Sequence, residues 1–301
     1  MKVGIIGAGS IGLLFAASLA KSFEVTLYTR TTEQANKINQ NGILVLKDSE
    51  QTGTAFVHAV PFTKWIGAEE ITIITVKQYQ LPAIIKMINN LPPPESLLFL
   101  QNGMGHLKLL QSLKTKNVFV GTVEHGALRE NLYTVRHNGV GNTNVAVFHG
   151  DSALLNKFIA SSPKDFPVLL QDQYYQMLVK KLIVNAVINP LTAILGVKNG
   201  SLVENSFYFQ AVNTLFAEIS SILNLDPMEG YLEQVIEVCQ QTAENRSSML
   251  KDIEAGRLTE VDAILGYLLD KAKEQQKVAP LLTCLYCLIK GKELDERGKE
   301  S

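Results

Sequence analysis

The residues best placed to do chemistry in this chain are one amine and two amides, spaced along a single apolar segment. In KKLIVNAVINP, residues 180–190, Lys181, Asn185 and Asn189 recur every four positions. Because each residue of an α-helix turns by about 100°, these side chains span an arc of roughly 80°. An ammonium there could stabilise negative charge growing on a substrate oxygen and then protonate it, while neutral amides hold the substrate. Lys180 is the rival amine, but it is out of register with the asparagines.

The same stripe has a structural interpretation, a solvated helix face. Solvated faces usually mix charges with Glu and Gln, and asparagine is a mediocre helix former, so the pattern favours a functional face. The pair Asn189-Pro190 also predicts weaker helical hydrogen bonding at that point, which would splay the stripe open.

A second polar cluster follows in ENRSSMLKDIEAGRLTEVDAI. Asn245 and Ser248 are placed to hydrogen-bond a small polar ligand. Thr259 with Asp262 three residues on predicts a helix N-cap of the capping-box kind. Glu260 would then lie in the first helical turn, where the helix dipole favours its ionised form. The alternative is that this segment is only a stabilising helix start.

The elements that would position such residues begin with a glycine-rich turn near the N-terminus. Three glycines stand in the order G-x-G-x-x-G, after an apolar strand pattern and before an Ala-rich helix pattern. This context predicts a dinucleotide-binding turn in which a helix N-terminus receives the pyrophosphate. The alternative is a glycine turn without a ligand. The residues expected to contact the cofactor are Gly7, Ala8, Gly9, Ser10, Ile11 and Gly12.

The end of the second predicted strand indicates which cofactor is bound. An NAD-binding unit usually carries an acidic residue there, but this strand ends in TLYTR, with Arg30 and no carboxylate. A guanidinium can bind a 2′-phosphate that a carboxylate would repel, so we expect NADPH/NADP rather than an ordinary exposed arginine. Lys77, Gln80 and Asn102 follow two further strand ends, and we expect them to face the cofactor as well.

Composition limits the class of protein. The chain has 301 residues, of which 46% are hydrophobic, and a formal net charge of −1. This length suits two domains, and the lack of a basic excess argues against a nucleic-acid partner. Every apolar run is expected to stop short of the roughly 18–20 residues of a membrane span. The N-terminus fits a folded strand–turn–helix better than a signal peptide, so we expect a cytoplasmic protein.

Cysteine and histidine patterns indicate neither disulfides nor metal. Cys239, Cys284 and Cys287 form an odd set without secretory context, so we expect free thiols. The C-x-x-C pair lies in an apolar helical run, which favours two small buried side chains over redox chemistry. The five histidines have no metal-ligand spacing, and His125, the nearest to a plausible site, is expected to be structural.

The order of the patterns predicts the fold. Short β-branched runs alternate with helical segments up to about residue 165, as in a parallel sheet covered on both faces. Residues 132–148 favour an antiparallel hairpin with Asn-Gly as its turn. The rest is helical. We predict an α/β Rossmann-type N-terminal domain at residues 1–167, which binds NADP, and an all-α C-terminal domain at 168–301, which carries the substrate and catalytic residues.

Together these motifs resemble a known family. The glycine turn with an arginine ending the second strand, VKQYQ, QNGMG, KLIVNAVINPLTA and ENRSSMLKDIEAGRLTEVD are similar to 2-dehydropantoate 2-reductases, also called ketopantoate reductases. The similarity covers nearly the whole chain, and the motifs of the second domain are the more specific. It implies NADPH-dependent reduction of 2-dehydropantoate, a 2-oxo acid, to (R)-pantoate on the way to pantothenate and coenzyme A.

The resemblance also implies roles for individual residues. Lys181 would be the proton donor, and Glu260 would interact with bound cofactor and substrate. Asn102 would bridge nicotinamide and substrate, and the backbone of Gly126 would touch the cofactor. The other implied contacts come from Arg30 and Lys77 near the 2′-phosphate, and from Asn185, Asn189, Asn199 and Ser248 to the substrate; Asn245 joins this last set from the residue pattern alone.

Two alternatives stay open. One is another two-domain NADP-dependent hydroxyacid dehydrogenase, against which the Lys–Asn–Asn stripe with Ser248 and Glu260 argues. The other is a non-enzymatic NADPH-sensing regulator, which would tolerate loss of Lys181 or Glu260. The sequence leaves open whether the chain forms a homodimer and how strictly it selects dehydropantoate over close branched 2-oxo acids.

Overall fold

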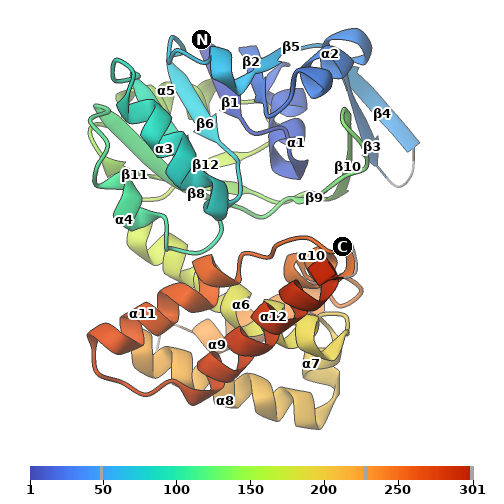
Figure 1. Cartoon of the computed structure of the whole chain (residues 1–301), viewed down its shortest axis with the longest axis vertical. Coiled ribbons are helices and arrows are strands. Elements are labelled where there is room, and N and C mark those ends of the chain that lie inside the picture. Colours follow the sequence, from blue (N-terminus) through green and yellow to red (C-terminus); the bar gives the residue numbers. More distant parts are fainter. Residues whose placement is uncertain (48–49, 227–229, 299–301) are drawn as a thin grey trace. The chain divides into compact units, whose positions relative to one another are not determined.

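The computed structural model describes residues 1–47, 50–226 and 230–298, which form two compact units (Figure 1). Unit 1 comprises Met1–Gln101 and Leu107–Met177. Unit 2 comprises Asn102–His106 and the chain from Leu178 onward. The units therefore divide inside a long helix, and a short segment from the first half of the chain belongs to unit 2. The domain boundary at residue 167 stays a prediction about where independent domains separate.

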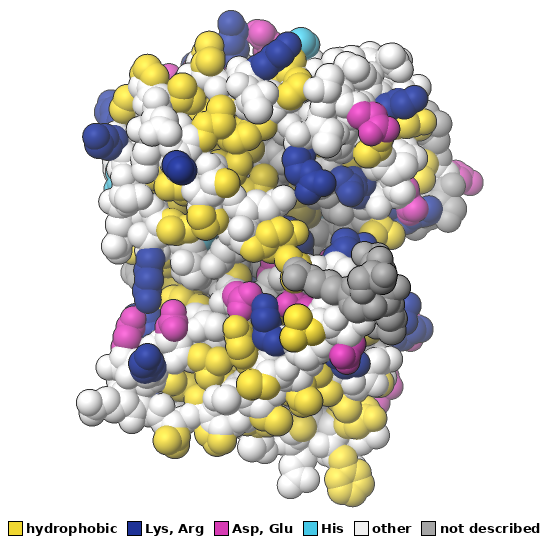
Figure 2. Space-filling model, viewed as in Figure 1, with side chains coloured by type: hydrophobic (Ala, Val, Ile, Leu, Met, Phe, Trp, Pro, Cys, Tyr) yellow, Lys and Arg dark blue, Asp and Glu magenta, His cyan; other side chains and the backbone are white. Residues whose placement is uncertain are grey.

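Charged side chains are mixed on the surface. On the face shown in Figure 2, Lys and Arg are interspersed with Asp, Glu and apolar side chains. This mixture agrees with the net charge of −1.

Unit 1 is built on an eight-stranded sheet with the order β12-β11-β8-β7-β6-β1-β2-β5. Neighbouring strands are parallel, except that β11 runs antiparallel to β8. The sequence order reverses between β1 and β6, and open sheets of this kind bind ligands beyond the carboxyl ends of the strands at that point. The predicted Rossmann-type class is confirmed. The strands are β1 (Lys2–Ile6), β2 (Glu24–Thr29), β5 (His58–Pro61), β6 (Ile71–Ile74), β7 (Ser96–Phe99), β8 (Asn117–Val123), β11 (Thr143–His149) and β12 (Val168–Leu170).

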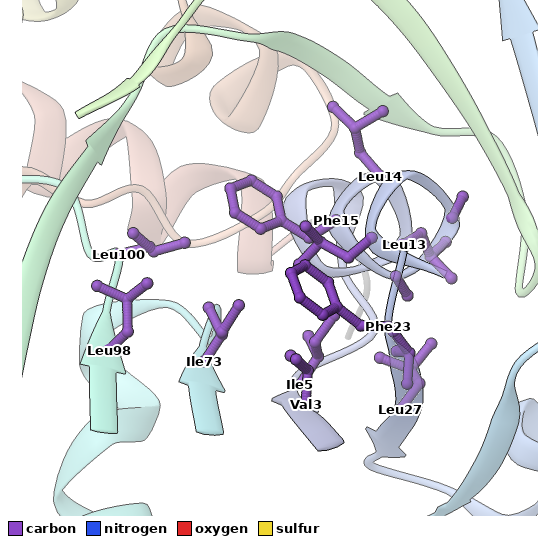
Figure 3. Close-up of a cluster of buried hydrophobic side chains, with 14 of the residues drawn as sticks. Val3, Ile5, Leu13, Leu14, Phe15, Phe23, Leu27, Ile73, Leu98 and Leu100 are labelled. Atoms are coloured by element: carbon purple, nitrogen blue, oxygen red, sulfur yellow. The ribbon is translucent and has the colours of Figure 1, made fainter. Parts of the chain in front are cut away.

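The helix after the glycine turn is fixed to this sheet by its apolar side chains. Figure 3 shows Leu13 and Phe15 of α1 together with side chains from the neighbouring strands, such as Ile5 and Ile73. These four side chains are fully buried, and each contributes roughly 1.5–3 kcal/mol by burial. The helical segments of unit 1 are α1 (Ser10–Leu19), α2 (Thr32–Asn41), η1 (Phe62–Lys64), η2 (Gln78–Gln80), α3 (Leu81–Asn89), α4 (Leu107–Leu110) and α5 (Ala153–Ser161).

A second, four-stranded sheet has the order β4-β3-β10-β9, with β3 (Ile43–Lys47), β4 (Glu50–Ala55), β9 (Gly126–Arg129) and β10 (Thr134–Gly139). The predicted hairpin at residues 132–148 was wrong, because β10 pairs with β9 and β3 while β11 pairs with β8 and β12. The β9–β10 turn is closed by Asn131, whose Oδ1 accepts from the backbone nitrogens of Tyr133 and Thr134. The Asn-Gly pair at 138–139 ends β10 instead.

Unit 2 is helical, as predicted, and no strand follows Leu170 in the part of the chain that the structure describes. In α12, Leu282, Leu285 and Ile289 form the buried face. Its elements are α6 (Tyr174–Leu195), which begins in unit 1, α7 (Ser201–Glu204), α8 (Ser206–Leu223), α9 (Tyr231–Gln241), α10 (Ser248–Glu254), the π-helical turn η4 (Asp262–Gly266), α11 (Tyr267–Glu274) and α12 (Pro280–Gly298).

The helix α6 does not open at Pro190, contrary to the prediction. Proline removes one backbone donor from a helix, and Thr192 lies two residues beyond it. The Thr192 hydroxyl donates to the carbonyls of Ile188 at 2.7 Å and Asn189 at 3.1 Å. The carbonyl that loses its backbone donor to Pro190 is that of Ala186, four residues earlier, so these bonds do not replace the missing one, and the helix still continues to Leu195.

By length and composition alone, α6 is long and apolar enough to cross a membrane, with a mean hydropathy of 1.5 in its most apolar window. The uninterrupted apolar runs within this helix are nevertheless shorter than a membrane span. Its three regularly spaced polar residues interrupt the apolar sequence, but they do not lower the mean hydropathy of the window below that of a possible membrane span. In the structure, 72% of that window is buried inside the protein.

The three cysteines are free, but the C-x-x-C pair is not buried as predicted. Cys284 and Cys287 are exposed on α12, because its buried face runs through residues three and four apart from Leu282 onward. Cys239 is fully buried, and burial raises the pKa of its thiol to about 11.

Candidate active site

The glycine-rich turn of unit 1 is shaped for an anion. Gly7 has a φ of +108°, and a Cβ added at Gly12 would lie 1.7 Å from the Gly7 carbonyl oxygen, so α1 begins in direct contact with the strand end. Thr75 fixes this contact by donating to the carbonyls of Ile6 and Gly7 at 3.1 and 2.9 Å. The N-cap Gly9 makes no side-chain cap, and no atom lies within 4 Å of where its Cβ would be. Uncapped amides beside open space fit a pyrophosphate.

Two residues that sequence reasoning missed hold the outer side of this turn. The carbonyl of Ala8 accepts from Gln34 Nε2 at 2.9 Å and from Arg129 Nη1 at 3.4 Å. Ser10 Oγ accepts from the backbone nitrogen of Arg129 at 3.0 Å. Ile11 is partly buried and packs against the apolar core of unit 1. Arg129 lies 121 residues from Ala8, and only the small sheet brings it here.

The other cofactor candidates of unit 1 follow strand ends or start a strand. Arg30 is exposed directly after β2, and Lys77 is half-buried after β6. Gln80 closes the turn after β6, because its Oε1 accepts from the Lys77 backbone nitrogen at 3.2 Å. Gly126 begins β9, where an added Cβ would lie 3.2 Å from the backbone nitrogen of Gly139.

The polar stripe of α6 is only partly withdrawn from solvent. Lys181 and Asn185 are half-buried and Asn189 is 6% exposed, whereas Lys180 is exposed. Within the part of the chain that the structure describes, the amide groups of Asn185 and Asn189 have no hydrogen-bond partner. Buried amides normally have protein partners, so these two are available to a ligand.

Asn199 and Asn245 meet where the α6–α7 connection packs on the end of α9. The Asn199 backbone nitrogen donates to the Asn245 carbonyl at 3.0 Å, and Asn199 Nδ2 donates to the Thr242 hydroxyl at 2.9 Å. Asn199 is 7% exposed, and its Oδ1 is buried without a partner among the described residues. The side chain of Asn245 is exposed. Asn199 therefore has a structural contact through its nitrogen and leaves its oxygen unpaired.

The start of α10 is tied to α6 by a serine that the sequence analysis passed over. Ser247, the N-cap, is 6% exposed and accepts from the Leu250 nitrogen at 3.1 Å. Its hydroxyl also forms a hydrogen bond with the Thr192 hydroxyl, and the two oxygens lie 2.7 Å apart. Ser248, the predicted ligand contact, is the first helical residue and is exposed. The buried Thr192–Ser247 bond thus places Ser248 one residue from a contact with α6.

Asn102 and Glu260 are joined in unit 2, although 158 residues separate them. Asn102 Nδ2 donates to Glu260 Oε2 at 2.8 Å. Glu260 is 8% exposed, so its carboxylate lies in a largely enclosed position. Both residues were predicted to contact cofactor and substrate, and the structure brings these two together.

The capping box predicted at Thr259 was wrong. The Thr259 hydroxyl does accept from the Val261 nitrogen at 3.1 Å, as an N-terminal cap would. Asp262 does not return to Thr259, because Glu293 of α12 occupies that place and accepts from the Thr259 backbone nitrogen. The carboxylate of Asp262 instead accepts from the Tyr286 hydroxyl at 2.7 Å.

Two histidines of unit 1, His125 and His137, lie side by side. His125 Nδ1 lies 3.2 Å from His137 Nε2 and accepts from the Gly141 nitrogen at 3.2 Å. Burial, together with His137, lowers the pKa of His125 to about 4. In the described residues no group of three or more His, Cys, Asp or Glu side chains is arranged to hold a metal ion.

These features define a class of protein: a Rossmann-type dinucleotide-binding unit followed by a helical unit that carries a lysine, amides and a carboxylate. That is the build of two-domain nicotinamide-dependent oxidoreductases. Two family models match the chain, "Ketopantoate reductase PanE/ApbA" over residues 3–150 and "Ketopantoate reductase PanE/ApbA C terminal" over residues 173–293. The chain belongs to the ketopantoate reductase family, which confirms the resemblance of its motifs.

Individual relatives agree with this assignment. A 2-dehydropantoate 2-reductase of Listeria innocua is 41% identical over 97% of both chains. The crystal structure of a probable 2-dehydropantoate 2-reductase from Bacillus subtilis has a TM-score of 0.88 at 41% identity, covering 97% of this chain and 100% of that one. A D-mandelate dehydrogenase solved with NADH has a TM-score of 0.87 at 24% identity and covers 99% of each chain, which shows a shared fold alone.

Proposed function

We propose that this protein reduces 2-dehydropantoate to (R)-pantoate with NADPH in the cytoplasm, as a step of pantothenate synthesis. The observation that carries the proposal is the polar face of α6, where half-buried Lys181 is followed by Asn185 and Asn189. The two amides lack partners among the described residues. The 41% identity to relatives of that name over 97% of the chain supports the same substrate.

In the proposed mechanism, unit 2 binds and protonates the substrate. When bound, NADPH would supply the hydride for C2 of the 2-oxo acid. The Lys181 ammonium stabilises the negative charge that develops on the carbonyl oxygen and donates the proton that completes the alcohol. Asn185 and Asn189 hold substrate oxygens without adding a second charge. The further substrate contacts are Asn199 through its unpaired Oδ1, Asn245 and Ser248.

The pair of Asn102 and Glu260 has a positioning role in this proposal. Because Asn102 donates its amide nitrogen to Glu260, its carbonyl oxygen is the atom left to accept from a ligand donor. Glu260 in turn accepts from Asn102 through Oε2 and acts on cofactor and substrate. Loss of either side chain would remove this hydrogen bond between the segment of Asn102 and the turn that carries Glu260.

For the cofactor, the proposal assigns the phosphates to unit 1. The turn of Gly7, Ala8, Gly9, Ser10, Ile11 and Gly12 receives the pyrophosphate, since its first amides are uncapped and Gly9 borders open space. Arg30 and Lys77 bind the 2′-phosphate and select NADPH over NADH. Gln80, which closes the turn after β6, and Gly126, which begins β9, are the remaining proposed cofactor contacts. Arg129 joins it, because its guanidinium lies beside the Ala8 carbonyl.

One assay tests the function directly. Initial rates of NADPH oxidation should be measured with 2-dehydropantoate, smaller 2-oxo acids and phenylglyoxylate, the keto acid related to mandelate. We expect the highest kcat/KM for 2-dehydropantoate. A higher value for another acid would favour the hydroxyacid dehydrogenase alternative, and cofactor binding without any turnover would favour a regulator.

The assembly is proposed to be a homodimer. A ketopantoate reductase from Staphylococcus aureus is described as dimeric and has a TM-score of 0.80, but at 23% identity that likeness shows only the fold. Light scattering coupled to gel filtration measures the assembly, and a monomer mass at micromolar concentration would contradict this part of the proposal.

A further inference from the structure

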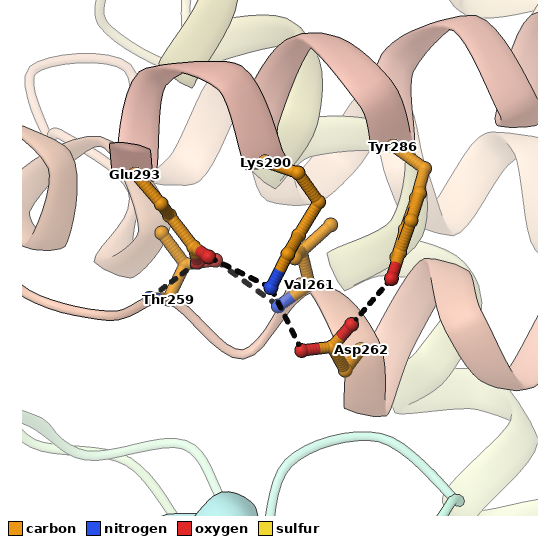
Figure 4. Close-up of polar contacts among 6 residues, drawn as sticks. All are labelled: Thr259, Val261, Asp262, Tyr286, Lys290 and Glu293. Carbon is orange, nitrogen blue, oxygen red and sulfur yellow. Dashed lines mark hydrogen bonds and ion pairs between the residues drawn. The ribbon is translucent and has the colours of Figure 1, made fainter. Parts of the chain in front are cut away.

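Glu293 of the C-terminal helix contacts Thr259, the residue before Glu260 (Figure 4), and we propose that Glu293 thereby positions Glu260 for the reaction. The inference rests on the proposed function, in which Glu260 acts on cofactor and substrate. Glu293 lies on α12 and is 6% exposed. Its Oε1 accepts from the backbone nitrogen of Thr259 at 2.9 Å and from the Thr259 hydroxyl at 2.6 Å. Thr259 directly precedes Glu260.

The contact between Glu293 and Thr259 holds the backbone on both sides of Glu260. The Thr259 hydroxyl, held by α12, accepts from the Val261 nitrogen at 3.1 Å. The carbonyl of Glu260 itself accepts from the nitrogens of Ala263 and Ile264 at 3.0 and 3.1 Å. With the amides before and after it and its own carbonyl engaged, Glu260 has little backbone freedom. The direction of its carboxylate therefore depends on what holds Thr259.

The charge of buried Glu293 is balanced on the same helix. Its Oε2 lies 2.9 Å from Lys290 Nζ, and the same ammonium lies 3.2 Å from Asp262 Oδ2. Burial by itself would lower the pKa of Lys290, but its hydrogen bonds to Glu293 and Asp262 outweigh burial and raise it. Lys290 thus stays protonated. A carboxylate in this position needs such partners, because an unpaired buried charge is strongly destabilising.

A second backbone segment holds the other side of the same turn. Asn102 donates to the Glu260 carboxylate at 2.8 Å, and the Met104 nitrogen donates to the Ala263 carbonyl at 3.3 Å. Gly103 has a φ of +74°, and a Cβ there would lie 2.1 Å from the Ala263 oxygen, so only glycine permits this approach. A shift of the turn by about 1 Å would break the Asn102 bond, and displacements of that size can cost about 100-fold in rate.

The test compares Glu293→Ala with a matched control on another helix. Glu218 of α8 also accepts two backbone hydrogen bonds from α12, from the nitrogens of Leu281 at 3.2 Å and Leu282 at 2.8 Å. We expect kcat/KM for 2-dehydropantoate to fall about 10- to 100-fold in Glu293→Ala and to change by less than about twofold in Glu218→Ala. Equal kinetic losses in the two variants would overturn the proposal.

Two further variants separate positioning from general stability. Glu293→Gln keeps an acceptor for Thr259, so it should recover most of the lost activity. In a Glu260→Gln background, Glu293→Ala should add little further loss, because its effect passes through Glu260. If the fold losses in kcat/KM of the two single variants multiply in the double variant, Glu293 does not act through Glu260. If Glu293→Ala does not fold, Glu293→Asp withdraws the carboxylate by one methylene and should lower kcat/KM in the same direction.

Hydrogen exchange provides a readout that does not depend on turnover. The backbone amides of Thr259 and Val261 should exchange faster in Glu293→Ala than in the wild type, and at the wild-type rate in Glu218→Ala. Unchanged exchange in Glu293→Ala would overturn the positioning contact itself. Wild-type turnover of 2-dehydropantoate tests the proposed function separately, so absence of turnover with the expected exchange pattern would reject the function and leave the contact standing.

Discussion

Replacing Asn189 by leucine should make the protein more stable and a poorer enzyme. Asn189 is 6% exposed, and its amide has no partner among the described residues. Its two amide atoms are still reached by solvent, because neither is among the fully enclosed unpaired atoms. An uncompensated buried amide costs about 1–3 kcal/mol, and partial access to water places Asn189 near the lower end, at about 1 kcal/mol.

The assay is thermal unfolding without ligands together with steady-state kinetics. Removing about 1 kcal/mol of desolvation cost should raise the Tm of Asn189→Leu by about 2 °C. Loss of a hydrogen bond to a charged substrate, about 1.5–3 kcal/mol, should lower kcat/KM for 2-dehydropantoate by roughly 10- to 100-fold. The two effects have opposite directions because the amide serves a ligand and not the fold.

Asn199→Leu is the matched control for stability. Asn199 has nearly the same burial, at 7% exposed, but its amide nitrogen donates to the Thr242 hydroxyl at 2.9 Å. The same substitution should therefore lower the free energy of unfolding by about 1–3 kcal/mol, since the Thr242 partner is left unpaired. If Asn189→Leu destabilises the protein as Asn199→Leu does, or leaves kcat/KM unchanged, the reasoning about the α6 face is refuted.

Further predictions concern the cofactor turn and pH. Arg30→Ala should raise the KM for NADPH much more than that for NADH, and equal rises would remove the 2′-phosphate role. Gly12→Ala should weaken NADPH binding in a fluorescence titration, because the added Cβ would lie 1.7 Å from the Gly7 oxygen; unchanged affinity would contradict the proposed fit of the turn. Burial lowers the pKa of His106 to about 4, whereas the pKa of this histidine in the unfolded chain is near 6.5. The unfolded chain therefore binds the proton first as the pH falls, and the free energy of unfolding decreases between pH 6.5 and pH 4. Between pH 7 and 4.5 the wild type should lose about 2 kcal/mol more unfolding free energy than His106→Met in urea titrations, and equal losses would refute this.

Much of the fold was predictable because it rests on local patterns. The strand–turn–helix around Gly7 and Gly12 combines glycine spacing with an apolar strand, and its partners lie close in sequence. The register of Lys181 with two asparagines follows from helix geometry alone. Family motifs then extended these patterns to positions such as Glu260, for which spacing alone left a structural interpretation equally open.

The missed capping contact involves residues far apart in the chain. Nothing near Thr259 indicates that its cap comes from Glu293, 34 residues away. The segment Asn102–His106 likewise joins unit 2, through bonds of Asn102 to Glu260 and of Met104 to Ala263, although the chain on both sides of it belongs to unit 1. The local sequence does not determine which acidic residue accepts from the Thr259 backbone nitrogen. Asp262 has the spacing of a capping box, so the sequence alone favours it over Glu293.

The exposed C-x-x-C pair and the misassigned hairpin share a different cause. In both, the segment was assigned correctly as helix or strand. The prediction was wrong about which helix face is buried in the first case and about which strands pair in the second. Cys284 is exposed because α12 buries Leu282 and Leu285, and β10 leaves β11 because β3 and β9 compete for it. Apolar composition over a whole turn of helix does not determine which face is buried.

The most direct test of the central claim compares two adjacent lysines. Lys181 is half-buried in line with Asn185 and Asn189, whereas Lys180 is exposed. With NADPH and 2-dehydropantoate at saturation, Lys181→Ala should lower kcat by about 100- to 10,000-fold, as expected for loss of a general acid, with little change in the affinity for NADPH. Lys180→Ala should keep a kcat near that of the wild type. Equal turnover in Lys181→Ala and the wild type, or a loss confined to Lys180→Ala, would contradict the account.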